Sequence, residues 1–216
     1  LAKKYMDQAA QLRLDTWRHC WKAERQLFSD TPAGKAFSQH ANILAVLTGA
    51  VPEERIPDLV NRMLSDKSLT PATFYFQFYL FEVLQMSGMA DRYLPLLDPW
   101  REMLDVGLTT FGENPDPTRS DCHAWSASPN YHLLSLVAGI RPSAPGFSKV
   151  RIAPSPGDLP DFMAWMPHPA GMIRVDWKKS GTNWECTVEL PAGLNGSYHW
   201  NGKQWPLKPG KNALRG

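Results

Sequence analysis

The stretch Arg141-Pro142-Ser143-Ala144-Pro145-Gly146 divides this sequence into two parts of different character. Proline and glycine interrupt regular structure, because proline lacks a backbone donor and glycine accepts left-handed dihedral angles. Before the stretch, apolar residues recur at helical spacing, and after it short alternating segments lie between turn pairs. The sequence therefore predicts an α plus β protein with two domains: helical hairpins over residues 1–142 and a small antiparallel β-sandwich over residues 147–216.

Six helices are expected in the first part. Residues 4–29 place Met6, Ala10, Leu14, Trp17 and Trp21 on one face, which predicts a long first helix. The helix over 72–86 is apolar nearly all round, which predicts burial on every side. The other helices are predicted over 35–49, from Pro52, over 90–105, and from near Ser120 to Ala138. Polar-faced helices alternate with apolar or mixed ones, and this alternation favours the outer and inner rings of part of an α/α toroid.

The second part has the pattern of strands. Met172-Ile173-Arg174-Val175-Asp176-Trp177 alternates apolar and polar residues, as a half-buried strand does. Asn-Gly pairs favour tight hairpin turns, because glycine accepts positive φ. Strands are predicted at 149–152, 162–166, 172–177, 184–190 and 198–200, with turn pairs at 156–157, 180–181, 195–196 and 201–202.

Composition excludes several classes of function. The 216 residues are 43% hydrophobic and carry a formal net charge of +2 from interspersed acids and bases, which argues against nucleic-acid or membrane partners. No apolar run approaches the roughly 20 residues that a membrane span needs, and the first residues do not resemble a signal peptide. Cys20, Cys122 and Cys186 lie far apart and none belongs to a CxxC pair, so no disulfide framework, metal site or cofactor is expected.

Polar and aromatic residues gather where the inner helices are expected to begin. If these helices run the same way, their starts meet at one mouth of the ring. Aromatic faces stack on the C–H surfaces of sugars, and carboxylates, amides and imidazoles bond sugar hydroxyls, so the set predicts a carbohydrate site. The candidate binding residues are Gln39, His40, Phe74, Asp121, His123 and Trp125, and the candidate catalytic residue is Glu113, in a loop rich in Gly, Pro and Asn.

Glycoside hydrolysis usually requires two carboxyl groups, one to protonate the leaving oxygen and one to activate water or attack the sugar. Glu113 is the one suitable carboxylate that the sequence makes evident. The second is not evident.

Three motifs resemble one known family. They are Gly107-Leu108-Thr109-Thr110-Phe111-Gly112-Glu113, Cys122-His123-Ala124-Trp125-Ser126-Ala127, and Gly139-Ile140-Arg141-Pro142 with Pro145-Gly146-Phe147. Their order and spacing are similar to those of the C-terminal portion of α-L-rhamnosidases of glycoside hydrolase family 78. The resemblance covers essentially the whole chain.

The resemblance implies an (α/α)6 catalytic barrel followed by a C-terminal β-sandwich, and hydrolysis with inversion of terminal deoxy-sugar or related glycosides on polysaccharide or glycoconjugates. It implies that Glu113 is the general base and that His123 lies in the sugar pocket. The family's general acid lies in the first half of the barrel, which the three hairpins of this chain do not contain. Position 112 departs from the family, which commonly has Trp where this chain has Gly112.

Other functions remain open at this stage. A catalytically inactive carbohydrate-binding toroid fits the same residues, as does another toroid enzyme such as an unsaturated-uronide hydrolase or an epimerase. The expected partners are a carbohydrate substrate and an N-terminal remainder of the same polypeptide, because the chain begins at Leu1 without an initiator methionine. Half a ring would expose inner-helix surface, so inactivity and self-association of the isolated chain are expected. The family suggests a periplasmic or secreted location.

Overall fold

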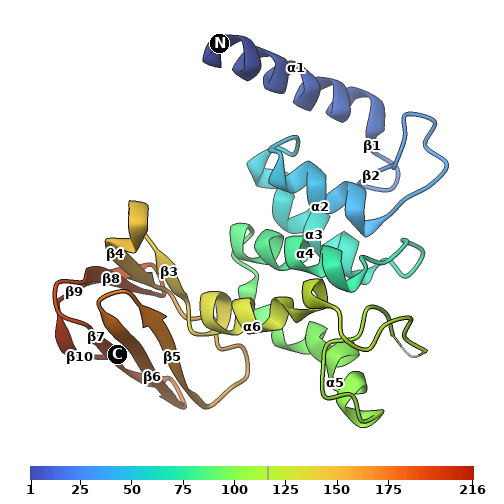
Figure 1. Cartoon of the computed structure of the whole chain (residues 1–216). Coiled ribbons are helices and arrows are strands. Elements are labelled where there is room, and N and C mark those ends of the chain that lie inside the picture. The colour runs from blue at the N-terminus through green and yellow to red at the C-terminus, as the bar shows by residue number, and fades with distance from the viewer. Residues whose placement is uncertain (116) are drawn as a thin grey trace. The chain divides into compact units, whose positions relative to one another are not determined.

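The structure, a computed structural model, describes residues 1–115 and 117–216, which form two compact units. The helical unit comprises Leu1–Met89 and Pro99–Ser128, and the sheet unit comprises Ala90–Asp98 and Pro129–Gly216. Figure 1 shows the helices of the first and the two small sheets of the second. The predicted α plus β class is confirmed at this level. None of the described helices is both long and apolar enough to cross a membrane.

The described α-helices range from 5 to 19 residues, and 3₁₀ turns lie between several of them. The α-helices are α1 (Ala2–Cys20), α2 (Gln39–Leu47), α3 (Ile56–Ser65), α4 (Phe74–Met86), α5 (Asp98–Asp105) and α6 (Ser128–His132). The 3₁₀ turns are Glu53–Arg55, Ala90–Arg92, Leu94–Leu97, Ala124–Ala127 and Pro145–Phe147, and a π-helical turn, Leu133–Val137, follows α6. Helix α2 packs against both α3 and α4 and buries Ile43, Ala45 and Val46 there.

Helix α2 begins at a well-formed cap. The hydroxyl of Ser38 accepts a hydrogen bond from the Ala41 N–H, which satisfies one of the donors that a helix start leaves unpaired. One turn later, the fully buried Asn42 accepts from the Phe28 N–H and donates to the carbonyls of Phe28 and Ser38. These bonds fix the chain before α2 against the helix itself.

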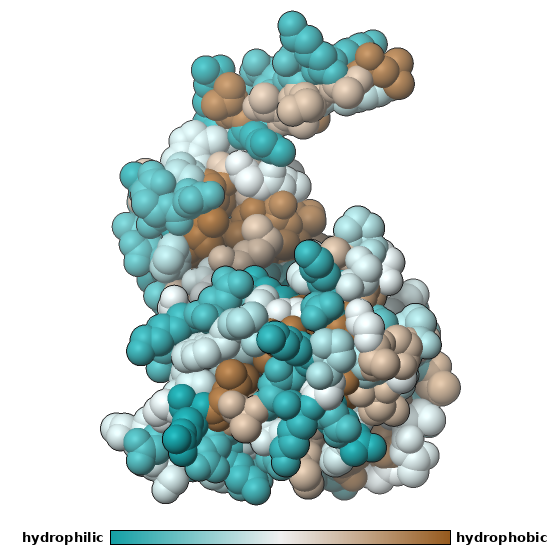
Figure 2. Space-filling view, turned by 90° about the vertical axis from the view of Figure 1, so that its left-hand side faces the viewer, coloured by the Kyte–Doolittle hydropathy of each residue, from teal (hydrophilic) through white to brown (hydrophobic). Residues whose placement is uncertain are grey.

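The predicted first helix over 4–29 is wrong beyond Cys20. The chain instead forms a short hairpin of β1 (Trp21–Lys22) and β2 (Leu27–Phe28). Trp21 stacks on Trp17 with ring centroids 4.8 Å apart, and Phe28 meets both rings edge-on, so aromatic packing folds the segment back. No residue of α1 is buried, and the space-filling view shows hydrophobic surface on this helix (Figure 2).

Helix α4 confirms the predicted helix over 72–86 but not its burial on every side. Phe74, Leu80, Phe81, Val83 and Leu84 are buried. Tyr75 and Met86, in contrast, are 47% and 58% exposed. The helix therefore has a core face and an aromatic face that reaches the surface.

The sheet unit contains two four-stranded sheets. Their orders are β10-β7-β6-β5 and β3-β4-β8-β9. The strands are β3 (Ile140–Pro142), β4 (Lys149–Ile152), β5 (Asp161–His168), β6 (Gly171–Ser180), β7 (Asn183–Leu190), β8 (Asn195–Trp200), β9 (Lys203–Leu207) and β10 (Gly210–Arg215). Their apolar core includes the fully buried Val150, Ile173, Trp177, Val188 and Tyr198.

One pair of strands departs from the predicted all-antiparallel arrangement, because β4 pairs with β8 in parallel. The predicted turn at Asn195-Gly196 is also wrong, since both residues belong to β8. A Cβ on Gly196 would lie 2.2 Å from the Val150 carbonyl oxygen, so this glycine permits the close approach of β4 rather than a turn. The turns at Ser180-Gly181 and Asn201-Gly202 connect β6 to β7 and β8 to β9 as predicted.

Candidate functional site

The loop after α5 is folded back on itself by its own backbone. Gly107, with φ of 81°, ends α5 in the left-handed conformation. The Glu113 N–H then donates to the Ser120 carbonyl (2.8 Å), and the His123 N–H donates to the Phe111 carbonyl (2.6 Å). These two bonds bring Glu113 and His123 to the same place although ten positions separate them in the sequence. They also hold residues 120–123 out of a helix, so the predicted helix start near Ser120 is wrong: the 3₁₀ turn begins at Ala124.

The carboxylate of Glu113 is paired with Arg119 of the same loop. The Arg119 Nε donates to Glu113 Oε2 (2.6 Å), and its Nη2 donates to Oε1. The Glu113 side chain is 9% exposed, whereas that of Arg119 is 77% exposed. The hydrogen bond and charge of Arg119 hold the pKa of Glu113 below its ordinary value, against the opposing effect of burial, so Glu113 is a carboxylate at neutral pH.

The ring of His123 lies on the other side of this carboxylate. Its Nε2 is 3.9 Å from Glu113 Oε1, which is an ionic contact only when the imidazole is protonated. Its Nδ1 is buried and has no hydrogen-bond partner among the described residues. Buried polar atoms are nearly always satisfied, so an unpaired Nδ1 is unusual; Nε2, and not Nδ1, is the nitrogen beside the carboxylate.

A line of aromatic rings extends from His123 across the surface of the helical unit. His123 contacts Trp125 (ring centroids 4.2 Å apart), Trp125 contacts Tyr75 (5.6 Å) and Tyr75 contacts Phe76 (6.4 Å). Phe76 in turn contacts His40, with ring centroids 4.4 Å apart. Partial burial lowers the pKa of His40, and the negative charge of Asp30 opposes that shift. Trp125 and Tyr75 are 48% and 47% exposed, so part of each ring face is open to solvent. We call these five residues the aromatic row.

Three other sequence candidates do not join Glu113 and the aromatic row. Phe74 is buried against Trp100 in the core, with ring centroids 4.8 Å apart. The side-chain amide of Gln39 accepts from the Ala72 N–H (2.8 Å) and donates to the Met63 carbonyl (3.4 Å), so it ties α2 to neighbouring backbone. Asp121 is exposed, and its backbone carbonyl accepts from the Thr110 hydroxyl.

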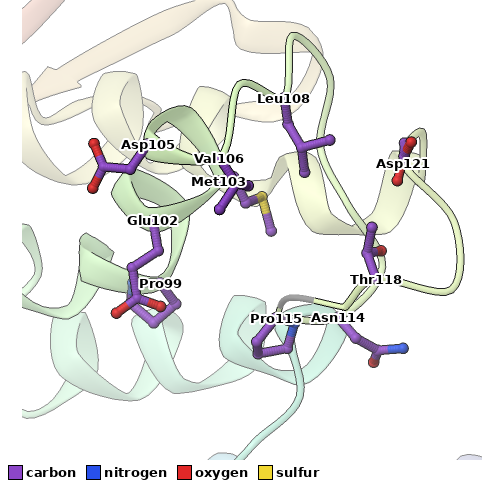
Figure 3. A pocket seen from close by; sticks show the side chains of 10 residues that line it. All are labelled: Pro99, Glu102, Met103, Asp105, Val106, Leu108, Asn114, Pro115, Thr118 and Asp121. Carbon is purple, nitrogen blue, oxygen red and sulfur yellow. The ribbon is translucent and has the colours of Figure 1, made fainter.

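Asp121 instead borders a cavity of about 370 Å³ between α5 and the loop. Met103 and Leu108 point into its apolar part, and Glu102 and Asp105 lie on the α5 side (Figure 3). Neither Glu113 nor His123 lines it. Gly112 packs nearby, where an added Cβ would lie 3.3 Å from both the Leu108 side chain and the Thr118 hydroxyl oxygen. A larger side chain at position 112 would therefore press on residues that line this cavity.

Sequence reasoning missed two features of the site. Arg119 was not singled out, because an arginine in a loop carries no sequence signal for the carboxylate that it will meet. The apolar pattern over 72–86 predicts only packing for Phe76, which also connects His40 to Tyr75. No group of three or more His, Cys, Asp or Glu side chains suited to a metal ion occurs in the described part of the chain.

Known proteins resemble this chain in sequence and in fold. Residues 139–210 match the family described as the bacterial alpha-L-rhamnosidase C-terminal domain. The structure also superimposes on a GH78 family rhamnosidase from Bacillus sp. GL1 with a TM-score of 0.82 and 26% identity over 92% of this chain. The chain is thus similar to the C-terminal portion of glycoside hydrolase family 78 α-L-rhamnosidases. No curated protein sequence matches it.

Two α-L-rhamnosidases share the fold of this chain at 19% identity. The Aspergillus terreus enzyme gives a TM-score of 0.81 over 99% of this chain, and the Streptomyces avermitilis enzyme, complexed with L-rhamnose, gives 0.80 over 100%. The chain spans about a quarter of the length of these solved proteins: 23% of the Bacillus, 27% of the Aspergillus and 24% of the Streptomyces chain.

Proposed function

We propose that this chain is the C-terminal part of an inverting, α-L-rhamnosidase-like glycoside hydrolase in which Glu113 activates the attacking water. The observation that carries the proposal is the meeting of Glu113, as a carboxylate, with the imidazole of His123. The family 78 relationship supports a glycosidase as the parent activity. The substrate class that we propose is a terminal deoxy-sugar or related glycoside on polysaccharide or glycoconjugates.

In this proposal residues 1–142 form the C-terminal half of an (α/α)6 catalytic barrel, and residues 147–216 form its C-terminal β-sandwich. The general acid then belongs to an N-terminal remainder of the same polypeptide. Without it the isolated chain is inactive, and its exposed apolar side chains, such as Leu12, Leu44 and Met86, favour self-association.

The Arg119 pair leaves Glu113 chemically able to act as a base. A carboxylate has about four lone-pair sites, and a two-point contact with a guanidinium uses two of them. One site on each oxygen remains for a water proton. Arg119 thus fixes the orientation of the carboxylate, while the His123 Nε2, 3.9 Å from Oε1, provides a polar partner for the water or for a substrate hydroxyl.

The aromatic row provides the binding surface in this proposal. The open faces of Trp125 and Tyr75 are suited to stack on the apolar face of a sugar ring, and the imidazole of His40 lies at the far end of the row. Asp121, Gln39 and Phe74 have no such position next to Glu113. Contact of these three residues with sugar stays a prediction.

The decisive experiment replaces Glu113 in the polypeptide that carries this chain together with its N-terminal remainder. Glu113→Gln is expected to lower kcat on an aryl α-L-rhamnoside by several orders of magnitude, because an amide cannot accept the water proton. Glu54→Gln, on an exposed turn, is the matched control and is expected to leave kcat unchanged. Near-normal turnover of folded Glu113→Gln rejects the base assignment.

Product analysis separates the mechanism from the family relationship. Proton NMR of the first-formed sugar is expected to show the inverted anomer. Glu113→Ala is expected to regain turnover in azide, which needs no general base, and to release the inverted glycosyl azide. A retained anomer would reject inversion while leaving the family relationship intact.

A second function is favoured by one specific observation, the engagement of both carboxylate oxygens of Glu113 by Arg119. The hydrogen bond from Arg119 lowers the pKa of Glu113 and so weakens it as a base, which favours a site that binds carbohydrate without cleaving it. Glycan binding by the intact polypeptide without release of product would support this inactive binder. Cleavage of unsaturated uronides or epimerisation of a free sugar would instead identify another toroid enzyme.

A further inference from the structure

The sheet unit contains a second polar pocket that is separate from Glu113. It has a volume of about 380 Å³, within the range of small-ligand sites. Its principal polar side chains are those of Arg151, Ser155, His199, Lys203, Gln204 and Asp91. The pocket lies where β4 ends and where the Asn201-Gly202 turn joins β8 to β9.

Strand register explains why cations gather there. Val150 and Ile152 are fully buried, so Arg151 between them points to the outer face of the sheet. Tyr198 is likewise buried, which places Ser197 and His199 on that outer face. Directly paired residues share a face, and Arg151 pairs with Arg141 on β3 and with Ser197 on β8.

The positive charge of this pocket is largely unneutralised. Among the described residues, no carboxylate forms an ion pair with Arg151 or Lys203. Asp91 is the one acidic residue in the lining, and its carboxylate accepts a bond from the Gly157 N–H (3.3 Å). Partial burial lowers the pKa of His199, and the charge of Arg151 contributes to the shift.

The remaining lining groups are those that bond hydroxyls. Ser155, Asn201 and Gln204 carry neutral polar side chains, and the indole of Trp200 lines the pocket as well. His199 Nε2 is hydrogen-bonded to the Ser197 hydroxyl (2.8 Å), which fixes the orientation of its ring. Two cations with several neutral hydrogen-bonding groups suit a ligand that has one negative charge and several hydroxyls.

We propose that this pocket binds an acidic sugar residue, with its anionic group between Arg151 and Lys203 and its hydroxyls on the neutral groups and Asp91. The site is independent of Glu113 and of glycosidase activity. The sheet unit would then bind an anionic carbohydrate whether or not the helical unit takes part in hydrolysis.

Titration of the isotope-labelled chain with glucuronate tests the proposal. NMR shifts are expected to saturate and to be confined to the Asn201 and Gly202 amides and the Trp200 indole N–H. Arg151→Gln and Lys203→Gln are each expected to weaken binding about tenfold or more, since each removes a charge-assisted hydrogen bond. Arg215→Gln, on an exposed strand of the other sheet, is the control and is expected to change nothing.

Two further ligands separate the parts of the proposal. Glucose, which has the hydroxyls without the charge, is expected not to saturate, and acetate, which has the charge without the hydroxyls, is expected to bind at least about tenfold more weakly. If glucose binds as tightly as glucuronate, the proposal of an anion-binding site is wrong. If acetate binds as tightly as glucuronate, the proposal that the ligand is a sugar is wrong. Unchanged glucuronate binding by folded Arg151→Gln and Lys203→Gln, checked by their unaltered amide spectra elsewhere, overturns the pocket itself.

Discussion

Arg119 holds the carboxylate of Glu113 at both oxygens, although its own side chain is mostly exposed. The pair therefore combines a nearly buried carboxylate with a guanidinium group that is mostly exposed to solvent. Release of Arg119 would leave the nearly buried carboxylate without its cationic partner, so the pair is expected to stay closed in the free site. Its main effect is on the orientation and ionisation of Glu113.

Replacing Arg119 is expected to raise the pKa of Glu113. In the native chain the pKa is depressed, chiefly by the hydrogen bond from Arg119, so the carboxylate form persists to more acid pH than usual. Stability from this pair is complete above the ordinary glutamate pKa of about 4.3 and is lost as pH falls through the depressed value. In Arg119→Gln a carbon-detected titration of Glu113 is expected to move to higher pH, and the acid limb of any Glu113-dependent activity is expected to move with it.

Arg174→Gln is the matched control for this titration. Arg174 pairs with Glu189 (3.4 Å) where both side chains are more than half exposed, so its removal is expected to leave Glu113 unaffected. An unchanged Glu113 titration in Arg119→Gln would show that Arg119 does not control this carboxylate in solution.

Gly139→Ala is expected to destabilise the sheet unit strongly. Gly139 has φ of 69°, and an added Cβ would lie 2.1 Å from the Ala153 carbonyl, which is backbone and cannot move aside cheaply. The loss should be at least about 2 kcal/mol, read from denaturant unfolding. Gly181→Ala, at φ of 60° with no neighbour within 4 Å, is expected to cost about 1 kcal/mol. Equal losses of unfolding free energy in Gly139→Ala and Gly181→Ala would contradict the predicted overlap of the added Cβ with Ala153.

Two tryptophans of the sheet unit are expected to differ sharply on substitution. Trp177 is fully buried and contacts Phe162 and Trp200, so Trp177→Ala should lower the unfolding free energy by about 3–5 kcal/mol. Trp165 is 50% exposed, and Trp165→Ala should cost less than about 1 kcal/mol. Thermal or urea unfolding monitored by circular dichroism measures both losses. A large loss of unfolding free energy in Trp165→Ala would indicate that this side chain makes a contact that the structure does not show.

Cysteine alkylation is expected to distinguish Cys122 from Cys186. Cys122 is exposed, whereas burial raises the pKa of Cys186 to about 12, so its reactive thiolate is scarce near pH 8. Iodoacetamide should therefore modify Cys122 in the folded chain and Cys186 only after denaturation, as peptide mass spectrometry can measure. Rapid modification of native Cys186 would show that the sheet unit opens readily.

Much of the fold could be predicted from local patterns. The strand Lys149–Ile152 matches its prediction at both ends, because alternation of Val150 and Ile152 with polar neighbours sets a clear period. The turns at Ser180-Gly181 and Asn201-Gly202 followed from the conformations that glycine accepts. The meeting of Glu113 with His123 was expected from the motifs and not from spacing alone.

The failures share a cause, since each depends on specific contacts in the folded chain and not on the period of one segment. The end of α1 at Cys20 depends on stacking of Trp17, Trp21 and Phe28, and helical spacing cannot reveal this. The late start of the turn at Ala124 depends on backbone bonds to Phe111 and Glu113. The Arg119 contact with Glu113 and the parallel approach of β4 to β8 likewise arise only once the chain is folded.

The parallel pairing of β4 with β8 also constrains the order in which the sheet unit can assemble. Ile152 pairs with Tyr198, and strands β5, β6 and β7 lie between them in the chain. Closing so long a loop costs chain entropy before any contact compensates for it, whereas the β5–β6 and β6–β7 hairpins close locally. The antiparallel sheet is therefore expected to form first during folding, and the sheet that carries Arg151 and His199 to be completed last.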